Sequence, residues 1–254
     1  MSRLWTIARG TLLEAIRHRI LYLLVFFAAA MILFSRFLSL LTVGQDAKII
    51  KDLGLSAINL FGLLVALFVG VGILFREMER RTVQTTLAEP VARWEYLLGK
   101  YTGITAAILL NAVLMALTLF GLLALNGDMD VGLVKAVAML LVELVFITAA
   151  AVFFSSFSTP IFSALFTTAF YLVGHLAWSL PLLEKRLPNG PAQSLVHIVY
   201  LIVPNLEYGD VRAEAVHGLP IEWSRLTGAA AYELTYAALL LLLACFSFRR
   251  RDLI

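Results

Sequence analysis

Cysteine is almost missing from this sequence, since Cys245 is the only one among 254 residues. A single cysteine excludes a disulfide bond within the chain and any metal site that needs several thiolates. The histidines His197 and His217 show no ligand spacing with other donor residues. We therefore expect no metal site and no cofactor bound by this chain.

Charged residues are scarce as well. They make up 15% of the chain, against about 25% in soluble domains, whereas hydrophobic residues reach 61%, against about 45–50%. Together with a mean hydropathy of +0.91, this composition indicates an integral membrane protein. The absence of any Ser-, Gly- or Pro-rich linker favours a single domain over residues 1–254. The net charge of +3 is too small to indicate nucleic acid as a partner.

The motifs of membrane hydrolases and of nucleotide-binding loops are also missing. No H-E-x-x-H helix and no G-x-S-x-G turn occurs, and the serine-rich turn at 155–160 has no identifiable base nearby. A phosphate-binding loop needs G-x-x-x-x-G-K-[ST], but Gly99-Lys100 is followed by Tyr101 and has Trp94 where the first glycine belongs. We expect a chain without catalytic residues, so an intramembrane hydrolase is the least favoured interpretation.

Long apolar runs are what the sequence has in abundance. A helix needs about 20 mostly apolar residues to cross the hydrocarbon of a bilayer. We predict an all-α membrane protein with six transmembrane helices, at about residues 20–41, 53–75, 101–127, 132–154, 161–182 and 226–248. Pro160, after a run of small hydroxyl residues, separates the fourth helix from the fifth.

A further apolar segment lies between prolines in the loop before the sixth span. Residues 192–203 would form only about 18 Å of helix, which is too short to cross the membrane. We expect a short helix in the outer leaflet, within a long outer loop at 183–225. The segment 1–19 precedes the first span and carries several arginines, so we expect an interfacial helix there.

The placement of Lys and Arg predicts the orientation of the chain. With six spans both termini share one side, and that side collects twelve of the twenty Lys and Arg residues. These lie in segment 1–19, in the loop 76–100 and after the last span. By the positive-inside rule, both termini and the loop 76–100 are expected to be cytoplasmic.

The loop 76–100 holds nine charged residues in the sequence REMERRTVQTTLAEPVARWEYLLGK. One interpretation is a solvated loop that only sets the topology. However, four of the charges are glutamates, which contribute little to orientation, so the mixed charge favours a surface that docks on another protein. The residue before a proline is pushed away from helical angles, so we expect a break at Glu89-Pro90 and a second short helix that leads into span three.

The pattern E-x-E-R-R-T-V-x-x-x-L-A-x-P-V-x-R-x-E-x-L-L-G-K, from Glu77 to Lys100, resembles the cytoplasmic loop after the second span in permease subunits of ABC-2 type transporters. The six spans, the basic N-terminal helix, the serine-rich turn, the long outer loop and the closing FRRRDLI fit the same family. The chain is most similar to the subgroup that includes the permease accompanying nitrous-oxide reductase maturation. One departure is Arg81, where many members have glycine.

The resemblance implies a permease subunit of an ATP-binding cassette exporter in the cytoplasmic (inner) membrane of a bacterium. Such permeases pair with a second copy, as a homodimer or a paralogous heterodimer, and sit on two ATPase subunits that bind ATP and Mg. A coupling helix in the loop 76–100 would dock on the ATPase. The implied contact residues are Glu77, Glu79, Arg80, Arg81, Thr82, Leu87, Pro90, Arg93, Gly99 and Lys100, with a second contact at Ser155, Ser156, Ser158 and Pro160.

Other partners and another function class stay open. The outer loop at 183–225 is long enough to bind an extracytoplasmic partner, and the spans contact membrane lipids. The sequence does not indicate the transported substrate. The main alternative is a membrane scaffold or channel without ATP coupling, which would have no ATPase partner.

Three ionisable residues map to the outer half of the predicted spans, namely Glu143, His175 and Glu233. Such residues are costly in a membrane and face protein or water. They either line a translocation pathway, with a Glu-His pair, or form interhelical hydrogen bonds that contribute about 1 kcal/mol to packing. The small residues of Gly99-x-x-x-Gly103 indicate close helix packing.

Overall fold

The computed structural model describes residues 3–39, 46–73, 75, 92–187 and 190–250. Within these ranges the ordered elements are all helical, with no strand. Six helical segments are long and apolar enough to cross a membrane. The predicted all-α class with six membrane-spanning helices is therefore confirmed.

The six long segments follow the predicted spans in order. They are α2 (Arg19–Ser39), α3 (Asp46–Val65) with its π-helical continuation η1 (Ala66–Val71), α6 (Arg93–Asn126), α7 (Val131–Ser155), α8 (Pro160–Leu176) continued by η2 (Ala177–Ser179) and α9 (Leu180–Arg186), and α12 (Trp223–Arg250). Before them, α1 (Arg3–Ile16) is the expected N-terminal helix. Its buried positions are small residues, Ala8, Thr11 and Ala15, which lets it lie close to its neighbour.

Two of these helices begin earlier than expected. Helix α3 starts at Asp46 instead of Leu53, because its polar first turns are stabilised by contacts within the protein, including an ion pair of 3.8 Å between Lys51 Nζ and Asp130 Oδ2. The expected short helix before span three and the span itself form one continuous helix of 34 residues, α6. Its start is capped by the Glu95 carboxylate, which accepts a hydrogen bond of 3.2 Å from the backbone N–H of Ala92.

The end of α6 and the starts of α7 and α8 are each explained by a residue type that favours a helix end. Gly127 has φ 76°, in the left-handed region that glycine adopts at low cost, and it ends α6. Asp130 then caps α7 by accepting a hydrogen bond of 3.2 Å from the N–H of Gly132. Pro160 occupies the first turn of α8, as expected for the turn between spans four and five.

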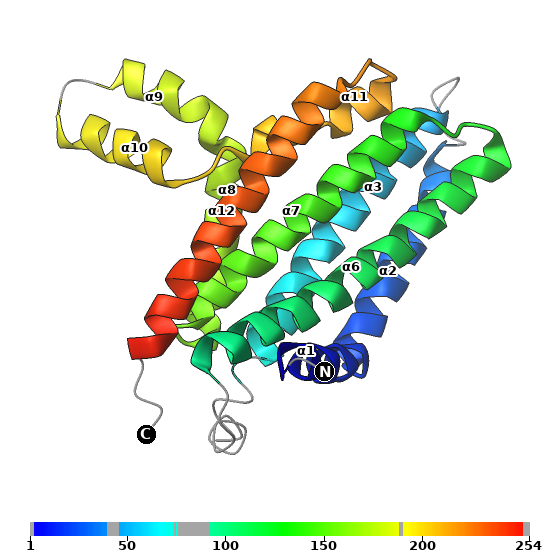
Figure 1. The fold of residues 1–254 in the computed structure, drawn as a ribbon. Helices are drawn as coiled ribbons and strands as arrows, with labels where there is room; N and C mark the ends of the chain where they lie inside the picture. The colour runs from blue at the N-terminus through cyan, green and yellow to red at the C-terminus, as the bar shows by residue number, and fades with distance from the viewer. Residues whose placement is uncertain (1–2, 40–45, 74, 76–91, 188–189, 251–254) are drawn as a thin grey trace.

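Figure 1 shows the bundle with α1 lying across one end, where the described N-terminus and the end of α12 also lie. The α6–α7 connection lies at the opposite end, together with α11 (Arg212–His217). Helices α3 and α7 are central, since 67% of the apolar window of each is buried, against 22–39% in the other four spans. The central pair therefore carries the core, and the outer helices expose apolar side chains on the bundle surface.

The predicted outer loop is largely helical. It contains α9, α10 (Pro191–Ile202), the short 3-10 turn η3 (Leu206–Tyr208) and α11. Helix α10 packs on α9 and stands away from the bundle (Figure 1), with no buried residue of its own. Segment η3 instead contacts α8 and brings Leu206 into the core. The loop thus divides into an exposed hairpin and a segment that packs on the spans.

Candidate functional site

The half of the bundle away from α1 contains a buried, hydrogen-bonded Glu–His pair between two spans. His175 lies near the end of α8 and Glu143 lies on α7, and the distance from His175 Nε2 to Glu143 Oε1 is 2.7 Å. Glu143 is only 7% exposed. The structure therefore brings together two of the three ionisable residues that the sequence placed in the outer half of the membrane.

Two uncharged side chains extend this pair to a third span. Asn59 of α3 donates a hydrogen bond of 2.9 Å from Nδ2 to the hydroxyl of Tyr171, one turn before His175 on α8. The Tyr171 ring stands edge-on to the His175 ring, with centroids 4.6 Å apart. Sequence reasoning did not single out either residue, because neither carries a charge.

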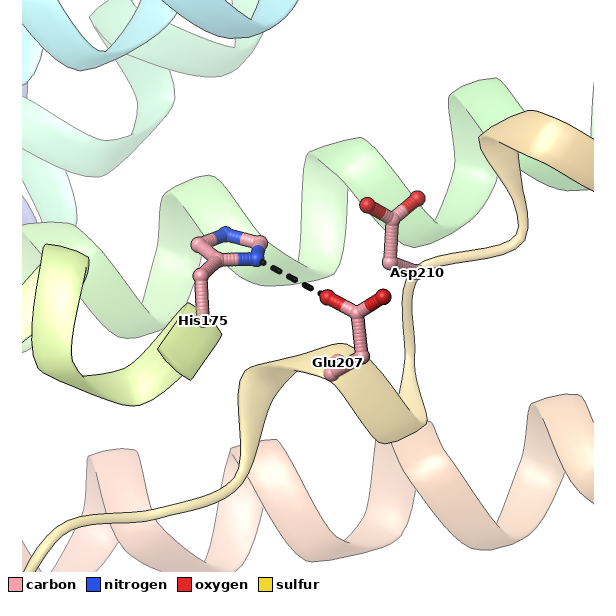
Figure 2. Close-up of side chains that lie close together, drawn as sticks. All are labelled: His175, Glu207 and Asp210. Atoms are coloured by element: carbon pink, nitrogen blue, oxygen red, sulfur yellow. Dashed lines mark ion pairs between the residues drawn. The ribbon is translucent and has the colours of Figure 1, made fainter. Parts of the chain in front are cut away.

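The segment after α10 brings more charge to the same place. Figure 2 shows His175 facing Glu207 of η3 and Asp210, which follows it. The distance from His175 Nδ1 to Glu207 Oε2 is 3.7 Å. Glycine at position 174 permits this approach, since a Cβ there would lie 2.8 Å from Leu206 Cδ1. The run Glu207 to Arg212 holds three charges just outside a span, which is the signal in the sequence that would have pointed here.

Asp210 is held by a guanidinium. Arg212 Nε donates hydrogen bonds of 2.9 and 3.0 Å to the two Asp210 oxygens. Burial alone would raise the pKa of Asp210, but the hydrogen bonds and the charge of Arg212 lower this pKa below its ordinary value. For Arg212, burial acts to lower the pKa, and Asp210 outweighs it, so the pKa lies above the ordinary value. Both groups are therefore charged.

Glu233 of α12 completes the cluster. It is only 2% exposed, and its Oε2 has no hydrogen-bond partner among the described residues. Its Oε1 lies against Gly209, where any Cβ would collide with it. The carboxylates of Glu143 and Asp210 are close enough to interact with it electrostatically. We call Glu143, His175, Glu207, Asp210, Arg212 and Glu233 the outer cluster.

The outer cluster has an excess of negative charge. It contains four carboxylates, one guanidinium and one imidazole. Carboxylates inside a membrane protein are costly unless they are paired, protonated or bound to a cation. The arrangement is therefore suited to hold a cation or protons between α7, α8, α12 and the η3 segment.

At the opposite end of the bundle, the predicted ATPase contact is described only in part. Glu77, Glu79, Arg80, Arg81, Thr82, Leu87 and Pro90 lie outside the described residues. Arg93 is exposed at the start of α6, beside Trp94, which is 53% exposed. Arg93 is therefore the described residue of the predicted contact that faces outward.

Gly99 and Lys100, which were also predicted to contact the ATPase, lie against helix α1. A Cβ on Gly99 would be 2.8 Å from Ile7 Cγ2, and one on Gly103 would be 2.5 Å from the carbonyl oxygen of Ala8, so α1 packs directly on these glycines. Lys100 is 5% exposed, and its Nζ lies 3.8 Å from Glu14 Oε2 of α1. The structure places both residues in the contact with α1 and not on an exposed surface.

The predicted second contact is the turn between α7 and α8. Ser155 and Ser156 are fully buried, and Ser156 Oγ donates a hydrogen bond of 2.7 Å to the Phe153 carbonyl. Ser158 is half-buried and Pro160 is exposed. The accessible part of this turn therefore runs from Phe157 to Pro160, at the same end of the bundle as α1 (Figure 1).

A comparison with protein families decides the class of the chain. The sequence profile described as ABC-2 family transporter protein matches residues 5–253. The chain belongs to the ABC-2 transporter family. As an ABC-2 permease it is a transmembrane subunit of an ABC transporter, in a family whose members work with an ABC ATPase and generally are not catalytic themselves. A search of curated proteins finds no match.

Proposed function

We propose that this ABC-2 permease forms the translocation pathway of an exporter and receives the movement of a separate ATPase through the loop 76–100. The observation that carries the proposal is the match of nearly the whole chain to the family, residues 5–253, on a bundle of six membrane helices. The sequence contains no phosphate-binding loop, so ATP and Mg would be bound by the partner chain.

Helix α6 supports a mechanical link between the two ends. It runs without interruption from Arg93, in the last part of the loop 76–100, to Asn126. At about 1.5 Å per residue it spans roughly 50 Å, which is longer than the hydrocarbon core. Helix α1 packs on its first turns at Gly99 and Gly103, and α3 and α7 also contact it. A movement of the loop would therefore be carried to the outer end as a movement of a rigid helix.

The proposed assembly has two permease copies, as a homodimer or a paralogous heterodimer, on two ATPase subunits in the inner membrane of a bacterium. Both termini would be cytoplasmic. The α9–α10 hairpin would lie in the outer leaflet, where its exposed Leu195, Ile198 and Leu201 contact lipid or an extracytoplasmic partner. The resemblance to the permease of nitrous-oxide reductase maturation belongs to this proposal as well.

Co-purification tests the proposal. A tagged permease extracted from its native membrane should bring down an ABC ATPase, and the double change Arg80→Glu with Arg81→Glu should reduce the ATPase recovered. The matched control is Lys185→Glu with Arg186→Glu, which reverses two exposed charges at the outer end of the chain. Recovery without any ATPase would favour the scaffold or channel interpretation. Equal recovery from both double variants would remove Arg80 and Arg81 from the contact.

A further inference from the structure

We propose that the outer cluster binds a divalent first-row transition-metal ion through His175, Glu207 and Asp210. One ligand atom from each of the three residues lies within 4.8 Å of the others, and Figure 2 shows the three side chains gathered around one space between α8 and the η3 segment. The sequence showed no metal motif, because these ligands come from two segments separated by the α9–α10 hairpin.

The orientation of the His175 ring is the first argument. Its Nε2 lies 2.7 Å from Glu143 Oε1, so Glu143 would keep the ring proton on Nε2 when Nδ1 binds an ion. The lone pair is then on Nδ1, which faces Glu207 Oε2 at 3.7 Å. A carboxylate that holds one ring nitrogen while the other binds the ion is the usual outer partner of a metal-binding histidine. Glu143 would thus be a positioning residue.

The chemistry of the donors defines the class of ion. One imidazole nitrogen with carboxylate oxygens suits borderline ions such as Zn²⁺ or Mn²⁺. Ca²⁺ and Mg²⁺ prefer oxygen ligands alone, and the cluster contains no thiolate for a soft ion. Ligand atoms around a tetrahedral Zn²⁺ lie roughly 3.4 Å apart. Ligand atoms up to 4.8 Å apart would need to close by up to about 1.4 Å, and the half-exposed Glu207 side chain has freedom to move.

The charge balance is the second, independent argument. The outer cluster has four carboxyl groups against one guanidinium and one imidazole, so a bound dication would offset part of its negative charge. Glu233 is 98% buried, and its Oε2 lacks a hydrogen-bond partner among the described residues. It lies against Gly209, between Glu207 and Asp210 in the chain. A buried carboxylate oxygen without a donor beside the site is what a nearby cation would satisfy.

Arg212 does not prevent binding. An ionised carboxylate offers about four lone-pair positions. The guanidinium occupies one edge of Asp210, and the backbone N–H of Arg212 donates a further hydrogen bond of 2.9 Å to Oδ1, so the position left for an ion is on Oδ2. Arg212 keeps the Asp210 carboxylate ionised and fixes its direction. The bound ion would join the end of α8 to the segment that leads into α12. This inference does not rest on coupling to an ATPase, so it is tested on the permease alone.

The test is a titration of the full-length permease, purified in detergent and stripped with a chelator. Zn²⁺ and Mn²⁺ are titrated separately and followed by calorimetry. We expect one ion per chain for the wild type, and loss of this binding in His175→Ala. The matched control is His197→Ala, which removes an exposed histidine whose Nδ1 lies 3.1 Å from Glu184 Oε1 in the hairpin. This control should bind as the wild type does.

Two further variants keep the test decisive if His175→Ala does not fold. Glu207→Gln removes one charge from a half-exposed ligand and should lose most of the affinity. Glu143→Gln should weaken binding by about 10- to 100-fold through the ring orientation. A wild type that binds neither ion, or a folded Glu207→Gln or His175→Ala that binds as tightly as the wild type, overturns the proposal.

Discussion

The two ends of the bundle are held together by different chemistry. At the end that carries α1, glycines and small side chains let helix backbones touch, as at Gly99 and Gly103. At the outer end, charged side chains from three spans and the η3 segment meet in the outer cluster. Close backbone packing is the ordinary way to join membrane helices, whereas buried charges are costly and usually have a function. The two ends therefore differ in what would disturb them. The contact of α1 with Gly99 and Gly103 depends on the size of the side chains, whereas the outer cluster depends on their charge.

The largest effect on stability is expected at the contact between α1 and α6. Gly103→Leu would place a Cβ 2.5 Å from the carbonyl oxygen of Ala8 and 2.6 Å from Thr11 Cβ, so α1 must move away from α6. Overpacking of this kind costs about 1–3 kcal/mol or more. Fluorescence-detected size-exclusion chromatography after heating should show a clearly lower midpoint. Gly121→Leu on the same helix is the control, because nothing lies within 4 Å of its Cβ position; equal loss in both variants would contradict the close contact.

A smaller effect is expected from the pair in the outer cluster. Glu143→Ala and His175→Ala each remove the 2.7 Å contact, and the pair should couple by about 1 kcal/mol in a double-mutant cycle. If both single variants assemble with the ATPase but transport fails, the two residues line a pathway. Failed assembly would instead assign them to packing. If the two changes in the free energy of unfolding are strictly additive, the contact does not contribute to stability.

The pH dependence tests the Asp210–Arg212 pair. Because the pKa of Asp210 is lowered in the folded protein, its contribution to stability is present above the unfolded value of about 3.9 and is lost as the pH falls through the folded pKa. Asp210→Asn should therefore reduce the thermal midpoint at pH 7, and the difference from the wild type should shrink toward pH 3. Asp52→Asn, at an exposed position on α3, serves as the control. A difference that grows on acidification would refute the assignment.

The smallest effect is expected at the start of α6. Glu95→Gln weakens the cap on the Ala92 N–H and removes an acid from the first turn, which costs about 0.3–1 kcal/mol. The thermal midpoint should fall by no more than a few degrees, and raised salt should reduce the difference. A loss as large as that of Gly103→Leu would mean that Glu95 has a role beyond capping.

The sequence predicted the features that depend on local pattern. Apolar length predicted the six spans, Pro160 predicted the turn before α8, and Gly99-x-x-x-Gly103 predicted close packing. It did not show that α1 is the partner of those glycines, because the arginine-rich segment is only weakly amphipathic. The predicted helix depths put Glu143 and His175 at similar levels and left a Glu-His pair open as one alternative, and the structure shows the two side chains 2.7 Å apart.

The rest of the outer cluster depends on how a long loop folds back. Glu207, Asp210 and Arg212 lie far from His175 in sequence, and their approach depends on the small residue Gly174 and on burial of Leu206. No periodic pattern in residues 183–225 indicates that contact. The predicted break at Glu89-Pro90 lies outside the described residues, and the short helix predicted after it continues into span three as the single helix α6.

The central claim is that α6 carries movement from an ATPase to the outer end of the bundle. Spin labels at Leu125→Cys, in a Cys245→Ala background, report the distance between the two copies, because Leu125 is 87% exposed near the outer end of α6. A label pair at Trp94→Cys and Leu125→Cys reports the length of the helix, about 46 Å. In the complex with its ATPase, Mg-ATP should change the distance between copies and leave the helix length unchanged. An unchanged distance between copies, in a complex that hydrolyses ATP, would contradict the account.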